Sequence, residues 1–138
     1  MIKLLAFVPS LLVLGAAMFL QEAGNTPETQ PFKVPPELVG KTNPVKPTPE
    51  GMAHAAKMWT YDCAICHGAT GDGNGELAHD MKPAPKDYRD PASLKGLSDG
   101  ELFYIIQKGK DQMPAEGDRA KPDDIWNMVS LVRSFAKK

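Results

Sequence analysis

Residues 4–20 form the most apolar stretch of the chain, with seventeen residues that carry no charge, preceded by the single cation Lys3. This layout is typical of a secretory signal, and Ala17 is the small residue before the expected cleavage site. The alternative is an uncut anchor, because a bilayer span takes about 20 residues, with a lower limit near 17. Residues 1–20 are therefore predicted to be a signal peptide or an N-terminal anchor. The protein is expected to be periplasmic or otherwise exported, or held at a membrane.

Residues 21–48 show neither helical nor alternating periodicity. Seven prolines lie between residues 21 and 49, which favours an extended chain that cannot close a core. We predict a proline-rich linker over residues 21–48. The apolar residues Phe32, Val34 and Leu38 leave a second interpretation open, in which residues 32–48 lie along the surface of the domain after the linker.

Three segments after the linker have the apolar spacing and the end signals of helices. The first begins after Thr48, whose hydroxyl suits a helix cap, and runs toward Cys63. The second begins after Ser98, which has capping-box spacing to Glu101, and it ends at Gly109. Both segments are therefore predicted to be amphipathic helices with defined starts.

The third predicted helix begins at Pro122. Its apolar residues recur at helical intervals: Ile125, Val129, Val132 and Ala136. No segment alternates over the length of a strand, so residues 49–138 are predicted to form one all-α domain. Most of residues 67–97 and 109–121 is expected to be loop. A domain with short helices and long loops has few apolar side chains for a core. A group other than side chains is therefore expected to fill the interior of the domain.

The net charge of the chain excludes one class of partner. Sixteen Lys and Arg residues face seventeen Asp and Glu residues, for a formal net charge of −1. A chain without excess positive charge has no electrostatic basis for gripping nucleic acid. DNA and RNA are therefore excluded as partners.

The chemistry of the chain is concentrated in Cys63-Ala64-Ile65-Cys66-His67, which has the C-x-x-C-H spacing of c-type haem attachment. Two thiols at this spacing near a helix end can reach the two vinyl groups of one porphyrin, and His67 then lies beneath the iron. Cys63 and Cys66 alone also fit a thioredoxin-like pair or half of a zinc site. A thioredoxin site needs a βαβ context, and a structural zinc site needs a second Cys or His pair. The sequence shows neither, so one covalent haem c, with its iron, is predicted.

With these residues the chain resembles the small class I mono-haem bacterial cytochromes c over residues 49–138. The positions that carry the resemblance are Ala55, Trp59, Cys63, Cys66, His67, the glycine-rich residues 68–75, Gln112-Met113-Pro114 and Trp126. Ala55 stands where glycine is commoner in that family. The resemblance implies a class I cytochrome c fold with three main helices and long loops, one covalent haem, and electron transfer. It also implies that a proline carbonyl, of Pro83 or Pro85, accepts a hydrogen bond from His67.

The sixth iron ligand is predicted to be Met113. The other candidates are Met52, Met58, Met81, Met128, His54 and His79. Methionines within helices more often fill gaps in a core, and the two histidines are expected to face solvent. Met113 lies in a loop between two predicted helices, long enough to reach the second face of the porphyrin, and His/Met ligation is usual for electron transfer. Met81, also in a loop, and His79 stay open as alternatives.

We therefore expect an exported mono-haem electron carrier that passes single electrons between a redox donor and a redox acceptor protein. Two ligands from the protein leave no open iron position, so no enzymatic activity is expected. The alternative is a haem-c subunit of a membrane or periplasmic oxidoreductase, tethered through its N-terminal segment. A gas-binding or peroxidatic haem would require an empty or labile sixth position.

Overall fold

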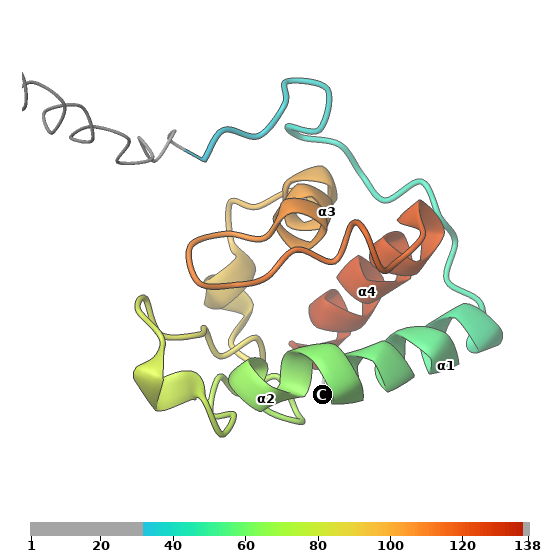
Figure 1. Cartoon of the computed structure of the whole chain (residues 1–138). Coiled ribbons are helices and arrows are strands. Elements are labelled where there is room, and N and C mark those ends of the chain that lie inside the picture. The colour runs from blue at the N-terminus through green and yellow to red at the C-terminus, as the bar shows by residue number, and fades with distance from the viewer. Residues whose placement is uncertain (1–31, 137–138) are drawn as a thin grey trace, which may run out of the picture. The chain divides into compact units, whose positions relative to one another are not determined.

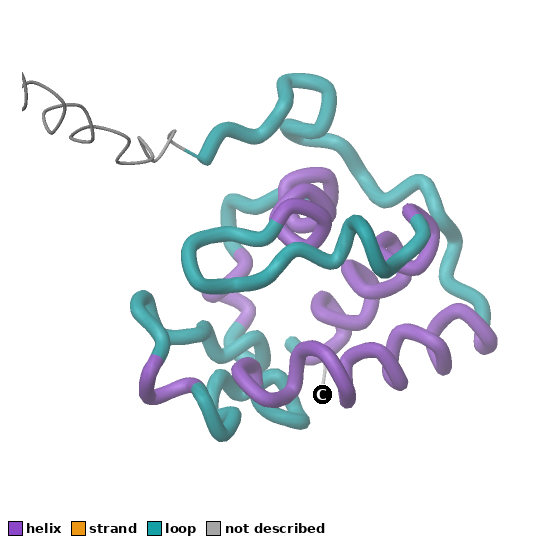
Figure 2. The backbone as a smooth tube through the Cα atoms, viewed as in Figure 1, coloured by secondary structure: helices purple, strands orange, loops and turns teal. Residues whose placement is uncertain are grey.

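The structure is a computed structural model that describes residues 32–136. The expected signal or anchor over residues 1–20, and residues 21–31 of the expected linker, lie outside this range. Within it the chain forms helices and no strand, with long loops between the helices (Figures 1 and 2). The three longest helices are α1 (Pro49–Met58), α3 (Asp99–Lys108) and α4 (Pro122–Phe135). The predicted all-α fold with three main helices is confirmed.

The first helix extends beyond α1. A π-helical turn, η1 (Trp59–Cys63), and a last α-helical turn, α2 (Ala64–His67), continue it without a break. It begins as predicted, because the Thr48 hydroxyl accepts a hydrogen bond of 3.1 Å from the amide of Gly51. The helical segment therefore covers residues 49–67 and carries the C-x-x-C-H motif at its C-terminal end.

The predicted ends of α3 are also confirmed. The Ser98 hydroxyl accepts from the Glu101 amide at 3.3 Å, and the Glu101 carboxylate accepts from the Ser98 amide at 2.8 Å. Gly109 ends the helix with φ of 72°, a conformation that favours glycine. Two short 3₁₀ turns, η2 (Ala78–Asp80) and η3 (Pro91–Leu94), interrupt the predicted loop over residues 67–97.

The core forms where α1 packs across α4 (Figure 1). Ala55 of α1 and Val129 of α4 are both 0% exposed, so a residue with only a methyl side chain occupies the crossing. Trp59 packs on Phe135 with ring centroids 4.8 Å apart. The buried cluster comprises Trp59, Leu94, Leu102, Phe103, Ile106, Ile125, Trp126, Met128, Val129, Val132 and Phe135. The apolar stripe predicted for α4 therefore forms one wall of this core.

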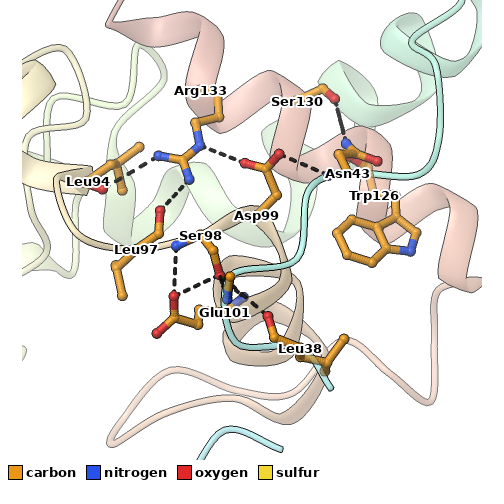
Figure 3. A network of polar contacts seen from close by, with 11 residues as sticks. Leu38, Asn43, Leu94, Leu97, Ser98, Asp99, Glu101, Trp126, Ser130 and Arg133 are labelled. Carbon is orange, nitrogen blue, oxygen red and sulfur yellow. Dashed lines mark hydrogen bonds and ion pairs between the residues drawn. The ribbon is translucent and has the colours of Figure 1, made fainter. Parts of the chain in front are cut away.

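Residues 32–48, called the strap below, pack on the domain. Asn43 donates from its side chain to the carbonyl of Trp126 at 2.8 Å and to the hydroxyl of Ser130 at 2.9 Å (Figure 3). The Lys41 carbonyl accepts from the amide of Gly100 at 2.9 Å. The compact unit begins at Phe32. Residues 32–48 thus follow the second sequence-based interpretation, and the boundary of the domain lies before residue 49.

Candidate haem site

The C-x-x-C-H residues share one turn at the end of the helical segment. Cys63 is the last residue of η1, and Cys66 and His67 close α2. Residues at positions i, i+3 and i+4 of a helix lie on the same face, so both thiols and the imidazole can meet one planar group. Both cysteines are free and partly buried.

The glycine-rich loop folds back onto this turn. The amides of Gly73, Gly75 and Leu77 donate to the carbonyls of His67, Cys66 and Ile65 at 2.9, 3.2 and 2.9 Å, in that order. These carbonyls belong to the last turn of a helix, where the helix itself supplies no donors. The loop thus holds the motif in place through its backbone.

Aromatic rings surround the His67 imidazole. Tyr88 stacks on it with centroids 5.2 Å apart and planes 24° apart, and the Trp59 ring lies at 5.8 Å. The Trp59 indole N–H donates to the carbonyl of Gly68 at 3.1 Å, which fixes that ring beside the motif. Burial lowers the pKa of His67 below its ordinary value. The imidazole is therefore neutral at pH 7, the form that binds a metal ion.

The hydrogen bond expected from His67 to a proline carbonyl is not formed in this structure. Its Nδ1 atom is buried and has no hydrogen-bond partner. The carbonyl oxygen of Pro85 lies instead against Gly73, where an added Cβ would come within 2.7 Å of it. The two loops therefore pack closely at Gly73, and a side chain there would meet this carbonyl.

The thiol of Cys63 is unsuited to disulfide exchange. Burial, followed by the charges of Glu116 and Asp62, raises its pKa to about 12. Redox-active cysteines have the opposite property, a lowered pKa that makes the reactive thiolate. Among the described residues, no three His, Cys, Asp or Glu side chains are grouped as a metal site. The thiol pair and the half-buried imidazole, whose buried Nδ1 atom has no hydrogen-bond partner, fit a covalently attached haem c.

Met113 lies at the tip of the loop between α3 and α4. Its amide donates to the Lys110 carbonyl at 2.8 Å and its carbonyl accepts from the Lys110 amide at 3.1 Å, so the tip is a tight turn. Asp111 in this turn has φ of 53°. The Met113 side chain is half-buried and packs against the core cluster.

The remaining candidates for the sixth ligand occupy different surroundings. Met128 is 2% exposed within the core, and Met58 packs against the same core. The side chains of His54 and His79 are 53% and 76% exposed. Met81 is half-buried in the loop beside Lys82, whose amide donates to the Gln112 side chain at 2.7 Å. The Met81 loop and the Met113 loop are therefore neighbours.

Three charged residues near the motif were missed in the sequence. Arg119 contacts both Asp62, which precedes Cys63, and Glu116, which follows the Met113 turn. Nothing in their spacing indicates this contact, because the residues become neighbours only when the loop returns to the helix.

Comparison with known proteins decides the family. The family model described as cytochrome C oxidase, cbb3-type, subunit III matches residues 50–132. The chain belongs to this family of c-type cytochromes. Cytochrome c6 of Diacronema lutheri is 33% identical over 85 residues, which cover 62% of this chain and 96% of that protein. The chain is thus a small class I c-type cytochrome with one covalent haem c, as the sequence predicted, and its role lies in electron transfer.

Two solved structures share the fold of this cytochrome. The Kuenenia stuttgartiensis reducing HAO-like protein complex Kustc0457/Kustc0458 matches with a TM-score of 0.58 and 22% identity, over 67% of this chain and 46% of that chain. This cytochrome thus spans less than half of that larger chain. The KustC0563 c-type cytochrome matches with a TM-score of 0.51 and 23% identity, over 59% of this chain and 95% of that chain.

Proposed function

We propose that this cytochrome is an exported mono-haem electron carrier. In this proposal Cys63 and Cys66 attach the haem, His67 is the proximal ligand and Met113 is the sixth ligand. The observation that carries the proposal is the C-x-x-C-H turn. Its thiols are free, and its half-buried imidazole has a lowered pKa and no hydrogen bond on the buried Nδ1 atom. When bound, haem c supplies an iron that gains and loses one electron.

The protein residues hold and shield this centre. Trp59 and Tyr88 pack on the His67 ring and limit its rotation. The Met113 turn places a thioether on a half-buried surface of the core. Ligands from the protein on both sides of the iron leave no position for a substrate, which is why we propose a carrier and no enzyme.

Redox partners are proposed to dock beside the attachment motif. Tyr61, Ile65 and Leu77 are 73%, 47% and 41% exposed, and the Leu77 amide donates to the Ile65 carbonyl at 2.9 Å, which places these two residues together. Exposed apolar side chains next to a redox centre supply contact area for short-lived complexes. Docking there would bring a partner close to the haem edge.

A second candidate function is a haem-c subunit of a larger oxidoreductase, held by the N-terminal segment. The family description, which names an oxidase subunit, favours this candidate. Within residues 32–136 no helix has the length and apolar character needed to cross a bilayer.

One purification tests the proposal. The full chain, expressed in a host that exports and matures c-type cytochromes, should retain its haem through acid-acetone extraction and titrate with a single one-electron midpoint. Loss of the haem on extraction would contradict covalent attachment. Fractionation of the native cell then separates the two candidates: a cleaved monomer in the soluble fraction supports the carrier, whereas an uncut chain in a stable membrane complex supports the subunit.

A further inference from the structure

One guanidinium joins the Met113 loop to the helix that carries the attachment motif. Arg119 Nη1 lies 3.2 Å from Asp62 Oδ1, and Arg119 Nη2 lies 2.5 Å from Glu116 Oε1. Asp62 directly precedes Cys63, and Glu116 follows Met113 by three residues. We call this contact of three side chains the Arg119 bridge.

Glu116 makes the bridge more than a surface ion pair. Its side chain is only 6% exposed, and its Oε2 atom is buried without a hydrogen-bond partner. Glu116 and Asp62 both contribute to the raised pKa of the Cys63 thiol, which places the Glu116 carboxylate near the attachment cysteine. A buried carboxylate needs a cation nearby, because its hydration has been lost. Arg119 supplies that cation.

Backbone hydrogen bonds hold the part of the loop that follows Met113 against α3. The Glu116 amide donates to the Ile106 carbonyl and the Gly117 amide to the Gln107 carbonyl, each at 3.0 Å. On the opposite flank, the Gln112 side chain accepts from the Lys82 amide at 2.7 Å. The segment that presents Met113 is thus a compact unit, attached to separate parts of the chain on its two sides.

We propose that Arg119 is a positioning residue that holds the Met113 loop closed against the attachment helix and so limits replacement of Met113 by external ligands. This inference rests on the proposed function, in which Met113 is the sixth ligand. Without Arg119 the Glu116 carboxylate would remain buried beside Asp62 with no cation, and opening of the loop would hydrate it. The open form would therefore gain population.

The test measures imidazole affinity of the ferric, haem-loaded full chain. Arg119→Gln should raise the affinity about tenfold, which corresponds to about 1.4 kcal/mol in favour of the open loop. The matched control is Arg89→Gln, because the ion pair and the side-chain hydrogen bonds of Arg89 are made at the surface with Asp87, only two residues away. It should stay within about twofold of the unmodified protein. In Arg119→Gln/Glu116→Gln the buried charge is gone as well, and the affinity should return at least halfway.

Amide hydrogen exchange gives a second readout that does not depend on ligation. The hydrogen-bonded amides of Met113, Glu116 and Gly117 should exchange faster in Arg119→Gln and at the unmodified rate in Arg89→Gln. If Arg119→Gln fails to fold, Asp62→Asn breaks only the contact between segments and should raise imidazole affinity about threefold to fivefold, as expected for a partly exposed pair. Affinity and exchange within about twofold of the unmodified protein, in whichever of these two variants folds, would overturn the proposal.

A wrong assignment of Met113 as the sixth ligand would give a different result from a wrong proposal for Arg119. If the unmodified ferric protein lacks the near-infrared band of a thioether bound to iron, Met113 is not the ligand and the proposed function is wrong at that point. The exchange rates of the three loop amides then decide on the Arg119 bridge alone.

Discussion

Two residues proposed to bind the iron are held by different kinds of contact. His67 lies within a helix turn between aromatic rings, whereas Met113 sits in a tight turn at the tip of a loop. A ligand within a helix is placed by local hydrogen bonds. A ligand in a loop depends on long-range contacts and opens more readily. Met113 is therefore the residue at which substitution is most informative.

Met113→Ala should remove the thioether-to-iron(III) near-infrared band, lower the reduction potential and let the reduced haem bind CO. The reason is that a soft thioether favours the ferrous state and occupies the sixth position. Met81→Ala is the matched control, because Met81 is also a half-buried loop methionine, and it should leave all three properties unchanged. Absorption spectra and a potentiometric titration check both variants. The opposite pattern would assign the ligand to Met81.

Glu116 is expected to make stability depend on pH. Burial raises its pKa above the ordinary 4.5, more than Arg119 lowers it. The folded state thus binds this proton more tightly than the unfolded state does. Its contribution to stability is complete below about pH 4.5 and is lost as the pH rises through the raised value.

The glutamine side chain of Glu116→Gln cannot ionise, so this variant does not lose stability at position 116 as the pH rises. Its free energy of unfolding, measured with urea, should become larger relative to that of the unmodified protein as the pH rises from about 4.5 through the raised pKa of Glu116. Glu76→Gln, at an exposed carboxylate, serves as the control. A difference between Glu116→Gln and the unmodified protein that does not change with pH would contradict the expected direction.

At the scale of elements, the π-helical turn η1 determines how the motif faces. A π turn accommodates one extra residue and so rotates the residues after it relative to those before it, and such turns are frequent at functional sites. Here η1 follows the core-facing Ala55 and ends at Cys63, the first residue of the C-x-x-C-H motif. One helical segment can thus pack on α4 with one part and present both thiols and the imidazole with the next.

The strap is the element whose attachment is most directly testable. Asn43→Ala removes the hydrogen bonds to the Trp126 carbonyl and the Ser130 hydroxyl. Losing such contacts at a partly buried site should cost roughly 1–2 kcal/mol, a fall in Tm of several degrees for a domain of about this size. Asn74→Ala, at an exposed asparagine, should change Tm little. Thermal unfolding followed by circular dichroism makes the comparison, and equal values for both variants would mean that the strap contributes no stability.

At the scale of the whole molecule, the haem is expected to be needed for folding. A loop-rich domain must offset an ordering cost of about 1–2 kcal/mol per residue for the backbone alone. Cys63→Ala/Cys66→Ala, expressed with export, should therefore be largely unfolded. Helical circular dichroism close to that of the native protein, together with cooperative unfolding, would show that the side-chain core suffices.

Association with redox partners should depend only mildly on salt. A formal net charge of −1 gives weak long-range steering, although Lys82, Lys86, Lys108 and Lys110 are exposed and can act locally. Second-order electron-transfer rates should fall less than about tenfold between low and moderate ionic strength. At moderate ionic strength, exposed charges more than ~10 Å apart are largely screened from one another. A hundredfold fall would point to a basic rim made of these lysines.

The sequence alone determined the features that depend on neighbours along the chain. Thr48, Ser98 and Gly109 mark helix ends because caps act within one turn, and the periodicity of α4 predicts its buried face for the same reason. Cys63, Cys66 and His67 form a motif whose chemistry requires that spacing. The helices, the all-α fold and the covalent haem c could therefore be predicted from local patterns, and the sixth ligand remains a prediction.

Only the tertiary structure decided the contacts between residues far apart in the sequence. Asn43 reaches α4, Arg119 joins Asp62 to Glu116, and Tyr88 stacks on His67. The side chains of Asn43, Arg119 and Tyr88 are polar or amphipathic and lie in segments without periodicity, so no local pattern indicates their partners. Those partners are set by where the loops pack on the helices. The close approach of the Pro85 carbonyl oxygen to Gly73 is a further contact of this kind. Such contacts arise when the whole chain closes, and no pattern in a single segment records them.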